Sequence, residues 1–167
     1  MRYAVQEKFF AAGEDNTINR EDGSPAYRVD GKALSLRNRM DIYDMQGNHV
    51  GSVQRKLMSM QPQYEIELPD GQRAVLHKKI SFLKQKWILT VGSDELDLTG
   101  NLLSHDFAIA RNGETIATIS KAWVSWTSTY GVDVRDGEND LLILGAVLGL
   151  EAEQDAEQGR GSGFHFG

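Results

Sequence analysis

Six basic residues in the middle of the chain are the strongest candidates for a binding function. Residues 49–90 hold seven Lys or Arg against three acidic residues, a net charge of +4. If the strands that carry these cations are neighbours, alternate residues would place several of them on one outer surface, which could hold a phosphate or an anionic lipid headgroup. The alternative is an ordinary solvated exterior, where lysines oppose sheet association. The candidate ligand-binding residues are Arg55, Lys56, Lys78, Lys79, Lys84 and Lys86.

Histidines and known catalytic motifs give no sign of an active site. The four histidines are far apart and lack the H-x₃-H or HExxH spacing of metal sites. The chain has no P-loop, no GxSxG and no CxxC, and the GRGSGF segment near its end follows no strand and opens no helix. We therefore expect a protein that is not an enzyme and that uses no cofactor and no metal.

Three acids at alternating positions, Asp136, Glu138 and Asp140, could be read as ligands for a hard cation. They lack the residue order and the distal glutamate of a calcium-binding loop. Acids at the start of a helix explain them more simply, because the helix dipole favours negative charge there.

Overall charge and composition restrict the partners and the compartment. The chain of 167 residues carries a net charge of −6, which argues against general nucleic-acid binding. Without cysteine, it has neither disulfides nor thiolate metal sites. The first residues lack the apolar core of a signal peptide, and we expect no transmembrane segment and a cytoplasmic location.

Residues 141–150, LLILGAVLGL, are the element that the rest of the chain must enclose. A helix that is apolar all round has to be buried all round, and this run is well short of the roughly 20 residues of a membrane span. A buried strand is the alternative, but acidic flanks and few β-branched residues favour a helix. We expect a helix over about 138–156, with Asp136 as its N-cap.

The preceding residues alternate apolar and polar side chains between turn signals, as half-buried strands do. The clearest hairpin signal is Asn112-Gly113, whereas residues 13–23 read as a polar loop and residues 34–39 as either a strand or a turn of helix. The expected strands are 2–9, 25–29, 40–45, 49–56, 64–68, 73–80, 85–91, 95–99, 105–111, 114–124 and 129–135.

An apolar helix and about twelve strands predict the same architecture. A barrel of about eight strands is filled by its own side chains, whereas one of about twelve can contain a helix and leaves no open edge. We therefore expect one mainly β domain over residues 1–156, a closed antiparallel β-barrel around a C-terminal apolar helix, and a disordered tail over 157–167. Gly145 and Gly149, on one helix face, would let large side chains of the wall approach closely.

Short motifs along residues 1–152 also carry a family resemblance. They are DMQGNHVG (44–51), Val53 with RKL (55–57), YEI (64–66), DG (70–71), KKI (78–80), GN (100–101), FAI (107–109), Gly113, IATISKAW (116–123) and TYGVDV (129–134). In this order they resemble the LURP-one-related family of tubby C-terminal-like domains, which are kin by fold to the phospholipid scramblases. The resemblance implies a twelve-stranded barrel around a C-terminal helix.

What the resemblance implies about activity is limited. Tubby domains bind phosphoinositides through basic residues, and scramblases are associated with lipid movement and calcium, but fold kinship alone does not carry function. We expect a non-enzymatic binding protein that recognises an anionic phospholipid headgroup or a phosphorylated ligand through its basic strands. The alternative is a protein-interaction or stress-associated scaffold with no small ligand. The sequence does not give the oligomeric state.

Overall fold

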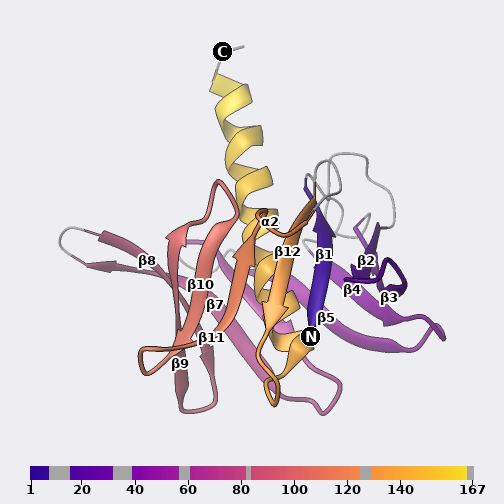
Figure 1. Ribbon diagram of the computed structural model, residues 1–167. Coiled ribbons are helices and arrows are strands. Elements are labelled where there is room, and N and C mark those ends of the chain that lie inside the picture. Colours follow the sequence, from indigo (N-terminus) through magenta and orange to yellow (C-terminus); the bar gives the residue numbers. More distant parts are fainter. Residues whose placement is uncertain (8–15, 32–38, 57–60, 82–83, 125–128, 165–167) are drawn as a thin grey trace.

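The chain forms a closed antiparallel barrel of twelve strands in which each strand pairs with its neighbours in sequence and β1 closes the ring with β12. The computed structural model describes residues 1–7, 16–31, 39–56, 61–81, 84–124 and 129–164. Figure 1 shows the strands surrounding α2, whose last turns extend beyond them. This confirms the expected fold class.

The twelve strands follow one another around the barrel in the order of the sequence. Every expected hairpin is present, and the Asn112-Gly113 turn joins β10 to β11. The strands are β1 (Arg2–Gln6), β2 (Asn16–Arg20), β3 (Pro25–Asp30), β4 (Arg39–Asp44), β5 (His49–Lys56), β6 (Gln63–Glu67), β7 (Arg73–Ser81), β8 (Lys84–Val91), β9 (Asp94–Asn101), β10 (Asp106–Arg111), β11 (Glu114–Ser120) and β12 (Thr129–Val134).

One strand lies where the sequence predicted a loop. Asn16–Arg20 form β2, which pairs with β1 on one side and β3 on the other. Only Ile18 of this polar segment is directed into the core, where it is 1% exposed. A single inward apolar residue is a weak signal in the sequence, so the pairing partners decide the conformation here. The expected element at 34–39 lies almost wholly outside the described residues.

The helix differs from its prediction at both ends. It spans Asp140–Phe164, so it runs past 156 into the segment predicted as a disordered tail. Its N-cap is Asn139 rather than Asp136, because the Asn139 side-chain oxygen accepts a hydrogen bond from the backbone N–H of Leu142 at 3.2 Å. Asp136 instead precedes Gly137, whose φ of +88° lets the chain turn before the helix begins.

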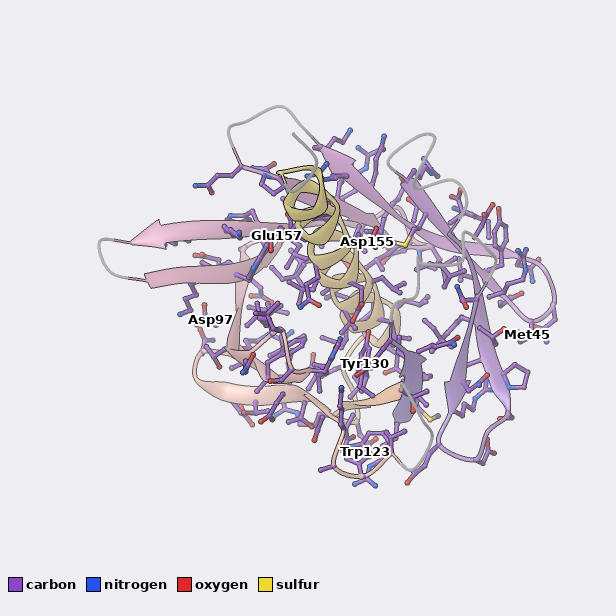
Figure 2. The ribbon with its side chains drawn as sticks, turned by 90° about the horizontal axis from the view of Figure 1, so that it is seen from above. Met45, Asp97, Trp123, Tyr130, Asp155 and Glu157 are labelled. Atoms are coloured by element: carbon purple, nitrogen blue, oxygen red, sulfur yellow. The ribbon has the colours of Figure 1, made fainter. Side chains whose placement is uncertain are left out.

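The apolar half of α2 fills the barrel. The side chains of Leu144, Val147 and Leu148 are each at most 2% exposed, and Figure 2 shows the helix at the centre of the ring of strands. The two glycines allow the close approach that the sequence predicted. A Cβ placed on Gly145 would lie 2.8 Å from a methyl group of Ile66, and one on Gly149 would lie 3.0 Å from a methyl group of Leu76.

Candidate functional site

Strand alternation divides the candidate cations whose side chains the structure describes between the two faces of the barrel wall. Leu76 is fully buried in β7, so Lys78, two residues later, is on the same inner face and Lys79 is on the outer face. In β5, Val53 is fully buried, which places Arg55 on the inner face and Lys56 on the outer face. The sequence predicted that several of these cations would share one outer surface; Lys56 and Lys79 are on the outer face, whereas Arg55 and Lys78 are on the inner face.

The two inner cations face the second half of α2. Arg55 Nη2 lies 3.6 Å from Glu153 Oε1, and the Glu153 side chain is only 3% exposed. Lys78 Nζ lies 3.4 Å from Glu157 Oε1 and 5.3 Å from the centre of the Trp87 ring. These cations neutralise carboxylates in the second half of α2 and connect that part of the helix to the barrel wall. Their charges are therefore already balanced within the protein.

Lys56 is separated from the other outer lysines by a strand and has its own partner. Its Nζ lies 3.7 Å from Glu65 Oε2, and the same carboxylate is 3.0 Å from Arg73 Nη1 through its other oxygen. The charge of Lys56 is thereby balanced within the sheet.

Lys79 and Lys86 remain together on the outer wall. They are directly opposite each other in the β7–β8 register. Lys86 Nζ lies 3.2 Å from Asp97 Oδ1, whereas no carboxylate among the described residues comes within 4.0 Å of the Lys79 ammonium group. Lys84 begins β8, but its side chain lies outside the described part of the chain.

A hollow in the outer wall adjoins this lysine pair. Its volume is about 420 Å³, within the range of roughly 300–1,000 Å³ that small-molecule sites occupy. Figure 2 places Asp97, one of its lining residues, on the outside of the ring and away from the helix. The lining residues are Lys79, Lys86, Ile88, Glu95, Asp97 and Asn112.

A buried polar cluster that sequence reasoning missed lies between the helix and the wall. His105 Nε2 and Glu151 Oε1 share a hydrogen bond, and the His105 ring stacks on Tyr130 with 4.2 Å between ring centroids. Burial, and next the Glu151 carboxylate, raise the pKa of Tyr130 well above its ordinary value. His105 and Glu151 are 46 positions apart in the sequence, so no short sequence motif predicts this pair.

The acids near the helix start have separate partners. Glu138 Oε1 accepts hydrogen bonds from Arg111 at 2.8 Å and Arg135 at 3.2 Å, and the Arg111 bond is the main cause of its lowered pKa. Asp140 accepts a hydrogen bond from the Tyr3 hydroxyl. Within the described residues, no group of three histidines or acids is placed to hold a metal ion.

Comparisons with known proteins agree on the family and the fold. The sequence profile of the LURP-one-related family matches residues 1–151. YxjI of Bacillus subtilis (strain 168), an uncharacterized protein, is 28% identical over 143 residues, which is 86% of each chain. An X-ray structure of a protein from Arabidopsis thaliana has a similar fold, with a TM-score of 0.58, 10% identity and coverage of 92% of this chain and 90% of that one.

The structure and the profile give one consistent assignment. No helix among the described residues combines the length and the apolar content that crossing a bilayer requires. The profile match spans all twelve strands and the apolar half of α2. The chain therefore belongs to the LURP-one-related family.

Proposed function

We propose that this chain is a non-enzymatic binding protein that recognises a phosphate group on a hydroxylated ligand at the Lys79–Lys86 hollow. The carrying observation is the direct opposition of the two lysines beside that hollow. Like charges opposite each other in a sheet are destabilising. Asp97 offsets the charge of Lys86, whereas Lys79 has no carboxylate of the described residues within 4.0 Å. A bound anion beside the pair would supply Lys79 with a negatively charged partner and would also attract Lys86.

The other lining residues suit the rest of such a ligand. Glu95 and Asp97 carry acceptors, and Asn112 carries both donors and acceptors. Carboxylates repel a bare phosphate but accept hydrogen bonds from hydroxyl groups. The hollow therefore fits a phosphorylated polyol better than a simple anion. The ligand class includes a phosphorylated inositol headgroup in a membrane and a free sugar phosphate.

Two observations support a function without catalysis. Residues 141–150 of α2 fill the barrel interior, which leaves the outer wall for small ligands. Among the described residues, the hollow is lined by no histidine and no hydroxyl-bearing residue, and one of its two carboxylates, Asp97, is paired with Lys86. Ligand binding alone accounts for the residues that line the hollow. We also expect the protein to be located in the cytoplasm.

Vesicle co-sedimentation tests the proposal. The wild-type protein should bind phosphatidylcholine vesicles that contain phosphatidylinositol phosphate, bind vesicles with phosphatidylserine more weakly, and lose both at high salt. The double substitution Lys79→Gln and Lys86→Gln should weaken binding about tenfold or more, at about 1 kcal/mol for each cation. The matched control is Lys56→Gln, which removes an outer lysine that Glu65 already neutralises.

A soluble arm separates the two ligand sources. Calorimetric titration with inositol phosphate, glucose phosphate and inorganic phosphate should show binding of the first two and little binding of the third. Equal binding by the double variant and the wild type in both assays would refute the proposal. Binding of the soluble compounds without vesicle binding would keep the site and assign it to free phosphorylated molecules.

A second candidate function is a protein-interaction scaffold with no small ligand. The observation in its favour is Leu103, a large apolar side chain that is 74% exposed. Exposed leucines occur singly on many soluble proteins. Leu103 by itself therefore does not define a protein-interaction surface.

A further inference from the structure

The Lys79–Lys86 hollow contains two carboxylates as well as its two lysines. Both acids, Glu95 and Asp97, lie on the outer face of β9, because Leu96 between them is fully buried on the inner face. Lys86 Nζ lies 3.2 Å from Asp97 Oδ1. The charges of this one lysine and this one acid therefore offset each other.

The other lysine and the other acid of the hollow have no such partner. Within the described part of the chain, no carboxylate comes within 4.0 Å of the Lys79 ammonium group, and no basic nitrogen comes within 4.0 Å of the Glu95 carboxylate. Both side chains are exposed, and both line the hollow. A ligand in the hollow thus meets one unbalanced positive charge and one unbalanced negative charge.

The strand register places these two charges at opposite ends of the hollow. Lys79 is opposite Lys86, whereas Glu95 is opposite Thr90, four residues further along β8. This offset and two strand spacings separate the α-carbons of Lys79 and Glu95 by roughly 16 Å, too far for the two side chains to reach each other. Ile88, which is 3% exposed, forms an apolar floor between the two ends.

We infer that the hollow selects a phosphorylated amino sugar, with its phosphate at the two lysines and its ammonium group at Glu95. The inference rests on the proposed function, because the phosphate is held as described there. An ammonium group and a carboxylate form a charge-assisted hydrogen bond, which is stronger than the bond that a hydroxyl group donates. Asp97 and Asn112 contact the hydroxyl groups, and the C–H face of the sugar ring covers the apolar floor.

Calorimetric titration with glucosamine 6-phosphate and glucose 6-phosphate tests this inference. The two compounds differ only in an ammonium group that replaces one hydroxyl group. The wild type should bind glucosamine 6-phosphate about fivefold more tightly, as expected for one solvent-exposed ion pair. In Glu95→Gln this preference should disappear, while glucose 6-phosphate binds as tightly as before or slightly more tightly, because a carboxylate that repels phosphate is gone.

Control variants make the result specific to Glu95. Glu67→Gln replaces another outer acid, 45% exposed and 4.0 Å from Arg73, which does not line the hollow, and should keep the full preference. The Lys79→Gln and Lys86→Gln double variant should lose binding of both compounds.

A vesicle arm identifies the source of the amino sugar. Phosphatidylcholine vesicles that carry a lipid with a phosphorylated glucosamine headgroup are compared with the soluble compound. Glu95-dependent binding to both would support a lipid headgroup as the ligand, and Glu95-dependent binding to the soluble compound alone would support a free molecule.

The outcomes separate this inference from the proposed function. Equal affinity of the wild type for the two sugar phosphates would overturn the inference and leave the lysine site intact, as would a preference that persists in Glu95→Gln. If the wild type bound neither compound, the proposed function would fail and the inference would fail with it.

Discussion

Lys78 and Lys79 are consecutive residues with opposite environments. Lys78 faces inward, is 18% exposed and contacts Glu157 of the helix. Lys79 faces outward, is exposed and lies opposite another lysine. The difference teaches that the basic middle of the chain is divided by strand alternation: its inner cations pair with carboxylates of the helix, whereas its outer lysines border the hollow in which we propose that a ligand binds.

The largest expected effect tests the inner region. Glu153→Gln should lower the free energy of unfolding by about 1–3 kcal/mol, because it leaves the Arg55 guanidinium facing the interior without its carboxylate. The loss is smaller than for a fully buried pair, since Arg55 is 16% exposed. Urea denaturation measures it. A loss below the error of the extrapolation would show that the helix is held by apolar packing alone.

The pH dependence of stability tests the same inner region through the buried Tyr130 hydroxyl. The pKa of Tyr130 is raised in the folded protein, so above about pH 10 the unfolded chain releases this proton while the folded chain keeps it. Stability should therefore fall as pH rises above about 10, with a contribution from this group of up to about 1.4 kcal/mol per pH unit. In Tyr130→Phe the decline should be shallower, as urea denaturation at pH 9 to 11 would reveal. Identical slopes would contradict the assignment.

A smaller effect on stability is expected for the Lys78–Glu157 pair, which is more exposed than the Arg55–Glu153 pair. Lys78→Gln should lower the free energy of unfolding by about 0.5–1 kcal/mol, because Glu157 is 45% exposed and water screens the pair. The contact between Lys78 and the Trp87 ring adds to the loss. Chemical denaturation at low and high salt should show a smaller difference at high salt. A salt-independent loss would point to packing of the lysine stem rather than to its charge.

The outer pair should have the smallest effect on stability. Lys79→Gln removes a repulsion between opposed lysines, so we expect a change within about 0.5 kcal/mol, in the stabilising direction. Denaturation midpoints of the wild type and the variant, compared side by side, measure it. A clear destabilisation would mean that Lys79 supports the fold.

Much of this architecture follows from the sequence. The apolar run at 141–150 and the alternating strands predicted the closed barrel and its helix, since only a closed sheet buries such a helix on all sides. Gly145 and Gly149 predicted the positions at which side chains of the barrel wall approach the helix closely. By contrast, β2 and the continuation of the helix to Phe164 were missed, because their short polar sequences give no strong periodicity.

The candidate site was predicted only in part. The prediction used strand alternation to place several cations on one outer surface but did not assign each cation to a face. Lys78 lies with Leu76 on the inner face, a signal present in the residues themselves. The contacts of Lys78 with Glu157 and of His105 with Glu151 depend on how the helix is seated in the barrel. That seating is set by packing over the whole chain, so no local pattern carries it.

One paired measurement tests the central distinction most directly. Lys78→Gln and Lys79→Gln are compared with the wild type for binding to vesicles containing phosphatidylinositol phosphate and for stability in urea. We predict that Lys79→Gln weakens vesicle binding about fivefold and keeps its stability, whereas Lys78→Gln lowers the free energy of unfolding by about 0.5–1 kcal/mol and keeps its binding. Equal losses of binding in the two variants would contradict this account and would restore a single basic surface.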